Sequence, residues 1–448
     1  MAATEENSIP LVVKKSEVVL VKPSQPIPDV SLSLSTIDND PHCEIINQTV
    51  CVYAPKPYLE DQANDDPASL LQGALSNALI YYFPLAGKIH RRSDDYRLQL
   101  SYKAGDGVPF ISATAACTLS SLNYLDSIGD AAYQLVPCYE PVKGCEEYDP
   151  LALQVTKFAC GGITIGMTHS HSVCDGVGIA QFFRAMIELA SGKTQPTVIP
   201  VWERERLTFK GKLGDVPDVP NAGSLYTDDM VQEILNITSD NIMKLKKAIV
   251  EDEHITNKQE NNVVVTTLEI VAAQVWRARC RALNMSPDEN MVLSLVIGIR
   301  GIMEPSLPEG YYGNAFVIGF VTSTAKDLSE SSLSRVVRQI KDMKRAVLDK
   351  RYVLGQLSHI ERRLEMKATN NIVSIGCTLL TDWRQIGLFY NGWGGLVNII
   401  PLVPRTNPLL YILLPPPKAD PGMSGGVRLL VTLPRDAMAK FKEEMNIV

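Results

Sequence analysis

Two histidines and an aspartate lie close together in the segment GMTHSHSVCDGVGIAQFF, which runs from residue 166 to residue 183. His169 and His171 are two residues apart, and Asp175 follows four residues after the second histidine. Imidazole and carboxylate groups bind transition metals, and a neutral imidazole accepts protons near neutral pH. Because the chain has only 6 histidines, this pair is the first candidate for chemistry.

Three interpretations of the segment compete. A metal site would use His169, His171 and Asp175 as ligands, but the familiar metallo-hydrolase pattern places its aspartate two residues after the second histidine, not four. The remaining histidines also lie in ordinary polar or turn contexts, where further zinc ligands are not expected. A second interpretation is a strand with solvated or hydrogen-bonded histidines. The third is a single general base, His171, with Asp175 fixing the local geometry.

Composition restricts the class of protein. The chain has 448 residues, 45% of them hydrophobic and 21% charged, which is typical of a soluble globular protein with two domains. Its net charge of −7 argues against nucleic acid as the main partner, since polyphosphate backbones attract basic proteins. A small, mostly apolar substrate at a local site fits this composition better.

Compartment and membrane signals point to the cytoplasm. The start, MAATEENSIP, is acidic and lacks the apolar core of a secretory signal. We find no apolar run of the ~18 residues that a spanning helix needs. The 9 cysteines are scattered without CxxC spacing, which is typical of reduced thiols. We therefore expect a cytoplasmic protein that is not embedded in a membrane.

Hydrophobic periodicity gives the elements that hold the histidine segment. Residues 151–159 and 163–169 read as two strands joined at Gly161 and Gly162, because glycine tolerates the positive φ of a hairpin turn. An amphipathic helix follows over residues 175–192, which places His171 at a strand–helix junction. Another helix is expected over residues 66–83, ending before Pro84.

Strands and helices alternate in both halves, which predicts a two-domain α/β protein with mixed sheets. Prolines and glycines concentrate between residues 193 and 222 and resist regular structure. We expect an N-terminal domain over residues 1–192, a crossover linker over 193–222 and a C-terminal domain over 223–448. The apolar run VLSLVIGIR, which ends at Arg300, is typical of a strand buried on both faces.

The whole chain resembles the BAHD acyltransferases, the plant acyl-CoA-dependent branch of the chloramphenicol-acetyltransferase-like fold. The central signature of this family, His-x-x-x-Asp-Gly, is matched by His171, Asp175 and Gly176. A lone HxxxD is a weak pattern, but further phrases of the family occur in order along the chain. They are YYFPLAGKI, LALQVTKFACGGITIG, VWERE, QVWRAR and GYYGNAF.

One family signature is altered in this chain. The family has Asp-Phe-Gly-Trp-Gly near its C-terminus, whereas this sequence reads YNGWGG. Gly392, Trp393 and Gly394 are retained and the aspartate is absent. In the family this segment is a structural loop away from the reacting atoms, so the departure bears on loop geometry and coenzyme access.

The resemblance implies a fold, a reaction and a set of roles. Two domains would enclose an active-site channel, in which His171 takes a proton from a hydroxyl or amine as it attacks an acyl-CoA thioester. Asp175 would pair with Arg300 and brace the junction. Thr381 would stabilise the oxyanion, and Trp383 would shape the acyl pocket.

The same resemblance predicts the partners of the protein. Acyl-CoA is expected as a co-substrate, with no cofactor bound permanently. The acceptor is expected to be an alcohol or amine of plant specialised metabolism, and the acyl group to be of the acetyl, benzoyl or cinnamoyl type. The protein is expected to act as a monomer.

Several assignments stay open at this point. Cys174 lies inside the motif but has no role in the family, so we expect it to be packed in the core. His169 either lines the acceptor channel or hydrogen-bonds within its wall, and the wall is slightly favoured. The functional alternatives are a catalytically impaired relative that acts as a binding protein, and a metal-dependent hydrolase using His169, His171 and Asp175.

Overall fold

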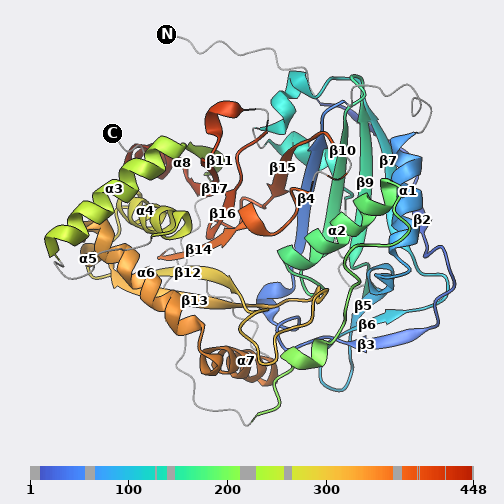
Figure 1. Ribbon diagram of the computed structural model, residues 1–448, viewed down its shortest axis with the longest axis horizontal. Helices are drawn as coiled ribbons and strands as arrows, with labels where there is room; N and C mark the ends of the chain where they lie inside the picture. Colours follow the sequence, from blue (N-terminus) through green and yellow to red (C-terminus); the bar gives the residue numbers. More distant parts are fainter. Residues whose placement is uncertain are drawn as a thin grey trace.

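The structure of the protein is a computed structural model that describes residues 11–55, 66–126, 129–138, 147–211, 229–256, 265–366, 376–390, 392, 394–418 and 420–445. Two large sheets, each with helices against it, form two halves that lie next to each other (Figure 1). This is the mixed α/β architecture predicted from the sequence.

The first half is built on a seven-stranded mixed sheet. Its strands are β1 (Val13–Lys15), β2 (Val19–Val21), β4 (Ile46–Tyr53), β7 (Val108–Ala115), β9 (Leu151–Phe158), β10 (Ile163–Ser170) and β15 (Leu396–Leu402). They lie in the order β1-β7-β9-β10-β4-β15, and β2 also pairs with β7. Strand β10 is antiparallel to both of its neighbours, β9 and β4, so it occupies the interior of this sheet.

The second half contains a six-stranded sheet in the order β11-β17-β16-β14-β12-β13. These strands are β11 (Met230–Ile237), β12 (Asn290–Gly298), β13 (Phe316–Thr324), β14 (Cys377–Asp382), β16 (Leu410–Leu414) and β17 (Val427–Pro434). A smaller four-stranded sheet joins the first half and contains β3 (Val30–Ser33), β5 (Lys88–Arg91), β6 (Leu98–Tyr102) and β8 (Glu147–Tyr148).

Helices cover the sheets in both halves. They are α1 (Pro67–Ala78), α2 (Gly176–Ala190), α3 (Ser239–Thr256), α4 (Thr267–Ala282), α5 (Ala325–Glu330), α6 (Leu333–Val347), α7 (Lys350–Glu365) and α8 (Arg435–Met445). Helices α1 and α2 share one apolar cluster with the strands of the first sheet. Helices α4, α6 and α8 share another with the second sheet.

The elements around the histidine segment match their prediction closely. Strands β9 and β10 form the expected hairpin, and Gly161 adopts a φ of 82° in its turn. The helix that follows, α2, buries apolar side chains such as Phe182 and Phe183 against the sheet. The hydrophobic pattern therefore changes from the period of a strand to the period of a helix between β10 and α2, as the sequence predicts.

One strand crosses the expected domain division. Strand β15 belongs by sequence to the predicted C-terminal domain, yet it pairs antiparallel with β4 at the edge of the first sheet. Figure 1 shows this red strand beside the blue one. A sheet edge with unpaired backbone groups accepts a strand from any part of the chain, which composition along the sequence does not reveal. The division at residues 193–222 remains a prediction.

Helix α1 ends earlier than predicted. Its last residue is Ala78, and residues 83–86 form a separate short 3-10 helix. Tyr82 is fully buried and packs edge-on against Phe182 of α2, with ring centroids 5.4 Å apart. The sequence predicts that Pro84 ends the helix, but the chain turns before it reaches the proline and buries Tyr82 from that turn.

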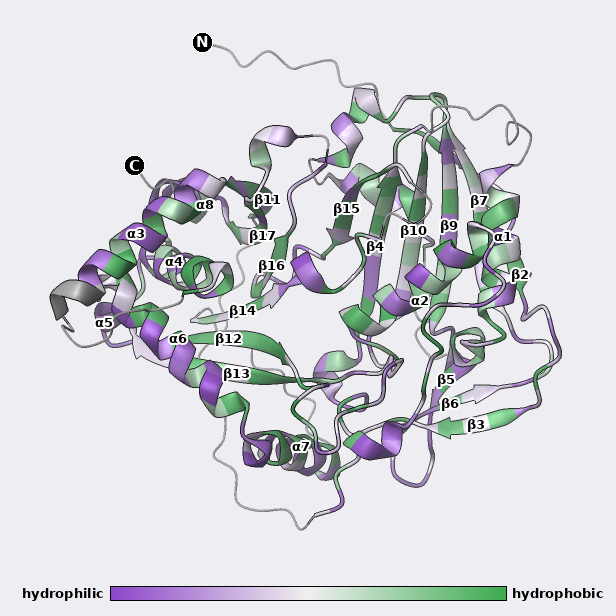
Figure 2. Ribbon diagram, in the orientation of Figure 1, coloured by the Kyte–Doolittle hydropathy of each residue, from purple (hydrophilic) through white to green (hydrophobic). Residues whose placement is uncertain are grey.

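The hydropathy of the elements agrees with this layering. Strands β12 and β13 are largely hydrophobic, whereas α6 carries hydrophilic residues along much of its length (Figure 2). On α6 the buried residues include Val336, Val337 and Ile340, which face the sheet. Each half therefore has its own apolar core, and the candidate site lies where segments of both halves meet.

Candidate active site

His171 lies directly after β10, at the start of the turn that leads into α2. Its backbone N–H donates to the carbonyl of Ile45 (2.9 Å), and its imidazole packs edge-on against Phe316, with ring centroids 5.8 Å apart. Within the described part of the chain, its Nδ1 is enclosed and has no hydrogen-bond partner. The residue is half-buried, which is compatible with access of a substrate to Nε2, and that access remains a prediction.

Phe316 connects this histidine with the second sheet. Strand β12 runs parallel to β14 and antiparallel to β13, with Gly298 opposite Phe316. The ends of β12 and β14 and the start of β13 consequently share one edge of that sheet. Arg300, Phe316 and Thr381 all belong to this edge, so the fold places their segments together on the side where the His171 ring packs.

Asp175 caps α2 and pairs with Arg300, as the sequence predicted. The guanidinium of Arg300 donates from Nη1 to Oδ2 (2.9 Å) and from Nη2 to Oδ1 (2.8 Å). Backbone N–H groups fill the remaining positions, from Gly178 to Oδ1 (2.9 Å) and from Ala315 to Oδ2 (3.0 Å). Both carboxylate oxygens therefore accept two hydrogen bonds each, which together occupy the carboxylate.

The protonation of Asp175 follows from these contacts. Burial acts to raise the pKa of the carboxyl, but the charge of Arg300 and the hydrogen bonds from Arg300, Gly178 and Ala315 outweigh it. The pKa is therefore lowered from its ordinary value of 3.8, and the group stays ionised. An ionised carboxylate with saturated lone pairs is suited to bracing the turn.

The two glycines after Asp175 are needed for close packing. A Cβ on Gly178 would lie 1.9 Å from the carbonyl oxygen of Tyr312, closer than atoms can approach. A Cβ on Gly176 would lie 3.2 Å from the side chain of Ile386, a tight contact with the segment that follows β14. The start of α2 thus touches both the 311–315 segment and the 386 loop.

His169 lies two residues before His171, within β10, and only 4% of its surface is exposed. Burial, and secondarily the nearby His171, lowers the pKa of His169 to about 3. Its Nδ1 has no hydrogen-bond partner among the described residues. His169 is therefore a buried, neutral imidazole two residues before His171, and whether it belongs to the channel or to its wall remains a prediction.

A metal site on His169, His171 and Asp175 fits this geometry poorly. All the acceptor positions of Asp175 are occupied by Arg300 and by backbone N–H groups. In the described ranges, no group of three or more His, Cys, Asp or Glu side chains is arranged to hold a metal ion. The metal interpretation would require Asp175 to abandon its ion pair.

A second buried ion pair, which no sequence pattern predicts, lies beside the same turn. Arg204 and Asp38 are 1% and 0% exposed, and Nη1 of Arg204 lies 3.3 Å from both carboxylate oxygens. The Nη2 group of Arg204 donates to the carbonyl of Val173 (2.8 Å), inside the turn. Arg204 belongs to the phrase VWERE, which carried part of the family resemblance. Its place in that phrase was the only signal in the sequence, and its burial is seen only in the structure.

Thr381 and Trp383 lie at the end of β14, and both are half-buried. Trp383 begins a short 3-10 helix over Trp383–Gln385, which Asp382 caps by accepting from the N–H of Arg384 (3.1 Å). Their position at the edge near His171 is compatible with the predicted oxyanion and acyl-pocket roles, which remain predictions.

The altered glycine–tryptophan loop is only partly described. Gly394 adopts a φ of 77°, a conformation that favours glycine, and Gly395 follows with a φ of 76°. Gly392 is exposed, and its carbonyl accepts from the hydroxyl of Ser191 (3.4 Å) at the end of α2. Trp393 lies outside the described residues. The two consecutive left-handed glycines lead directly into β15.

Comparison with known proteins assigns the chain to a family. The model of the Transferase family matches residues 11–448. The chain belongs to this family, the BAHD acyltransferases. It is 42% identical to a spermidine coumaroyl-CoA acyltransferase of Arabidopsis thaliana, covering 99% of this chain and 97% of the relative. It is also 42% identical to a spermidine sinapoyl-CoA acyltransferase of the same plant, covering 98% of each.

Solved structures agree on the fold of this BAHD chain. Vinorine synthase superposes with a TM-score of 0.71 at 20% sequence identity, covering 96% of both chains. TRI101 of F. sporotrichioides, solved with coenzyme A and T-2, also reaches 0.71 at 14% identity, covering 92% of this chain and 97% of the other. The protein is therefore an acyl-CoA-dependent acyltransferase with the two-domain fold predicted above. No helix within the described ranges is long and apolar enough to cross a membrane.

Proposed function

We propose that this acyltransferase moves a hydroxycinnamoyl-type group from its CoA thioester to an amine nitrogen of a polyamine such as spermidine, with His171 as the general base. The observation that carries the choice of acceptor is the 42% identity, over nearly the whole chain, to two spermidine acyltransferases that use coumaroyl-CoA and sinapoyl-CoA. The geometry around His171 supports the choice of base.

The reaction begins with the acceptor amine. Aliphatic amines are protonated at neutral pH, with a pKa near ~10 in the case of lysine, so the attacking nitrogen first loses one proton to solvent. The neutral amine then attacks the thioester carbonyl carbon, and Nε2 of His171 takes the second proton as the new C–N bond forms. The edge-on packing of the ring against Phe316 supports a fixed orientation of the imidazole, in which Nε2 is the proposed base.

The tetrahedral intermediate then needs a hydrogen-bond donor for its oxyanion. The hydroxyl of Thr381 takes this part, and Trp383 lines the pocket of the aromatic acyl group. Collapse of the intermediate breaks the carbon–sulfur bond, and the CoA thiolate collects the proton from the His171 imidazolium. The products are the amide and free CoA thiol, and His171 returns to its neutral form.

Transfer is direct, without an acyl-enzyme. Cys174 lies in the motif, but its side chain is 1% exposed and burial raises the pKa of its thiol far above the ordinary value. A thiol that stays protonated and enclosed is not a nucleophile. Both substrates must consequently be bound together, and the expected kinetics are those of a ternary complex, with intersecting initial-rate plots.

The remaining parts of the proposal concern the setting of the enzyme. It acts as a monomer in the cytoplasm, with no permanently bound cofactor and without nucleic acid or membrane as partners. The net charge of −7 and the scattered cysteines support this setting. Its metal independence is supported by the four hydrogen bonds that occupy Asp175.

Incubation of the purified protein with coumaroyl-CoA and a mixture of spermidine, aromatic amines and alcohols tests the proposal. Mass spectrometry should find coumaroyl spermidine as the main product, CoA thiol should appear in equal amount, and a chelator should leave the rate unchanged. The same mixture with the His171→Ala variant is the matched control.

Other outcomes identify the alternatives. An ester product with no amide would transfer the assignment to an alcohol acceptor. Release of free coumaric acid that stops in chelator would support the metal-dependent hydrolase. If coumaroyl-CoA binds but none of the acceptors in the mixture is acylated, the result would support a binding protein that has lost catalysis.

A further inference from the structure

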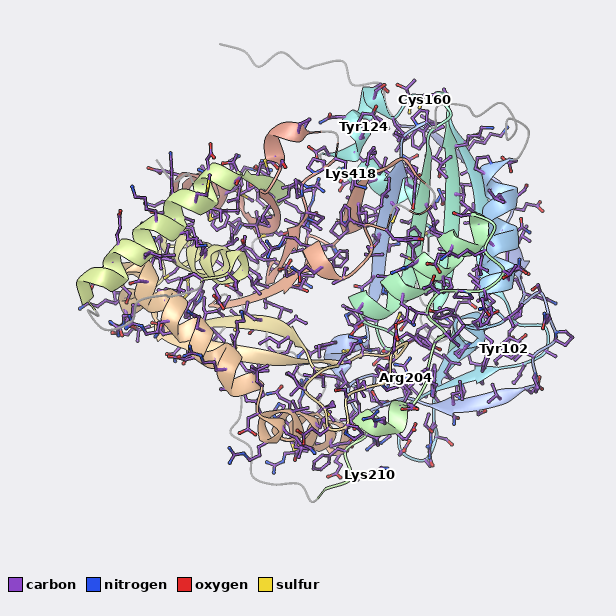
Figure 3. The ribbon with its side chains drawn as sticks, in the orientation of Figure 1. Tyr102, Tyr124, Cys160, Arg204, Lys210 and Lys418 are labelled. Carbon is purple, nitrogen blue, oxygen red and sulfur yellow. The ribbon has the colours of Figure 1, made fainter. Side chains whose placement is uncertain are left out.

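Arg204 and Asp38 form an ion pair in the interior of the molecule, although they are far apart in the chain. Arg204 lies between the two halves, near the segments that connect β12 to β13 (Figure 3). Both side chains are almost completely buried. A buried pair gives up the hydration of two charges, so its presence beside the catalytic turn calls for a function besides stability.

The surroundings of Arg204 fix its guanidinium in one place. Trp202 and Tyr312 stack near it, with their ring centroids 4.3 Å and 5.0 Å from Cζ. Asp38 accepts from Nη1, and the carbonyl of Val173 accepts from Nη2 at 2.8 Å. The planar fork of an arginine thus connects a carboxylate on one side with the backbone of the His171 turn on the other.

Asp38 organises a second contact to the same turn through Asn314. The side-chain amide of Asn314 donates to Oδ1 of Asp38 (2.8 Å) and to the backbone carbonyl of His171 (2.7 Å). Two backbone N–H groups also donate to Asp38, from Asn314 (3.2 Å) and from Ser35 (2.9 Å). Asn314 is 0% exposed, so these bonds are shielded from water.

Two carbonyl groups of the turn, those of His171 and Val173, therefore accept hydrogen bonds from side chains that Asp38 holds. The bond to the His171 carbonyl and the bond from its N–H to Ile45 restrain the backbone on both sides of its Cα, and so restrain the direction in which the imidazole extends. We propose that Asp38 and Arg204 are positioning residues for His171, acting through Asn314 and through the carbonyl of Val173. The ion pair keeps the turn in the geometry that brings Nε2 to the acceptor.

A displacement of a catalytic group by about 1 Å can lower the rate on the order of 10²-fold. Loss of either contact to the turn should accordingly lower kcat by about 10- to 100-fold while KM for both substrates stays within about twofold. A pair that only stabilised the core would behave differently, because each folded molecule would keep its kcat.

The decisive variant is Arg204→Lys. A lysine ammonium keeps the charge beside Asp38, but as a single point it does not reproduce the fork that also reaches Val173. The matched control is Arg428→Lys, because Arg428 is also 0% exposed, with Nη1 on Asp126 (2.7 Å) and Nη2 on Asn398 (2.8 Å). Among the described residues, its hydrogen bonds to Pro415, Asp126 and Asn398 do not reach the His171 turn.

Both variants are compared as full-length enzyme, with melting temperature, kcat and KM measured together and folded sites counted by titration with CoA. The expected result is a lowered melting temperature in both variants, and a lowered kcat per folded site only in Arg204→Lys. Wild-type kcat per folded site in Arg204→Lys, or an equal loss in both variants, would overturn the positioning role.

Asn314→Ala decides the matter if Arg204→Lys does not fold. It removes the amide that reaches the His171 carbonyl and leaves the ion pair in place, and Asn398→Ala is its control in the Arg428 network. A fall in kcat in Asn314→Ala alone supports the positioning role, and an unchanged kcat contradicts it. The positioning role rests on the proposed function of His171. If His171→Ala keeps full activity, the proposed function of His171 is wrong. If His171→Ala loses activity and Asn314→Ala keeps it, only the positioning role is wrong.

Discussion

Two arginine–carboxylate pairs flank the turn between β10 and α2, and they are built differently. Asp175 and Arg300 meet fork to fork at 2.8 and 2.9 Å, and the arginine keeps 24% of its side-chain surface exposed. Asp38 and Arg204 meet through one nitrogen at 3.3 Å and are buried completely among aromatic rings. The first pair is held by its own two parallel hydrogen bonds. The guanidinium of the second pair is held mainly by the aromatic rings and the Val173 carbonyl around it.

The difference indicates how the turn is held at two ends. Asp175 caps the helix after the turn, while Arg204 and Asn314 hold the carbonyls at its start. Arg204 belongs to the predicted crossover linker, so a segment that composition marks as irregular contributes a buried contact to the site. Both arginines lie outside the first half, and the histidine turn is therefore completed only when the rest of the chain has packed onto it.

The largest expected effect comes from His171→Ala, which removes the group that both pairs are proposed to hold. A single general base contributes about 10²–10⁴-fold, so kcat should fall by that factor. No ion pair is broken, and the melting temperature should stay near that of the wild type. Turnover close to wild type in a well-folded variant would show that neither pair serves a catalytic base at this position.

Asp175→Asn tests the bidentate pair and should act on stability first. The change leaves the buried part of Arg300 without its counter-charge, which costs about 3–5 kcal/mol in comparable pairs. Urea denaturation measures the loss directly. Asp349→Asn is the control, since Asp349 pairs with Arg351 on the surface, where solvent screens the pair and the expected loss is small.

The pH dependence of this contribution follows from the lowered pKa of Asp175. A carboxyl whose folded pKa lies below its unfolded value stabilises the protein above the unfolded value and loses that contribution as the pH falls through the folded one. The difference in stability between wild type and Asp175→Asn should therefore persist down to a pH of about 4. Normal stability combined with lost turnover would instead make Asp175 a catalytic partner.

The same two pairs show what the sequence could and could not predict. The pair of Asp175 with Arg300 was predictable, because the family resemblance implies an arginine partner for Asp175 and Arg300 ends the matching apolar strand. The hairpin and α2 were predictable from local periodicity. Asp38 and Arg204 are 166 residues apart and lie in segments without regular periodicity, so only the folded chain shows that they meet.

Long-range pairing limited the fold prediction in the same way. The edge position of β15 beside β4 depends on which sheet offers a free edge, and no local pattern records that choice. The end of α1 depends on the burial of Tyr82 against α2, a tertiary contact that acts before Pro84 is reached. Residue types and motifs indicated the chemistry of the site, whereas the network that holds it required the structure.

Thr381→Val tests the opposite side of the site, at the sheet edge that also carries Arg300. If the hydroxyl donates to the oxyanion, its removal should lower kcat by about 10²–10³-fold, with little change in KM or stability. Thr378→Val is the control on the same strand, since the Thr378 hydroxyl is enclosed and has no hydrogen-bond partner among the described residues. Equal activity of the two variants would leave the oxyanion to another donor.

The smallest expected effect concerns His169, a buried polar group whose Nδ1 has no hydrogen-bond partner among the residues that the structure describes. Burial lowers its pKa to about 3, so it stays neutral in the folded protein while it takes up protons below a pH of about 6.5 in the unfolded chain. Between these values the unfolded state binds more protons, and wild-type stability should fall as the pH falls. Linkage sets this loss at about 2 kcal/mol between pH 7 and pH 5.

His169→Met removes this titration and keeps an apolar side chain of similar length in the wall. Relative to the wild type, the variant should therefore gain about 2 kcal/mol of unfolding free energy on going from pH 7 to pH 5, whatever its stability at pH 7. Urea denaturation at both pH values measures the difference, in which the titration of all other groups cancels. A difference that does not change with pH would mean that protons reach the folded His169 ring, as they would if it lined an open acceptor channel beside His171.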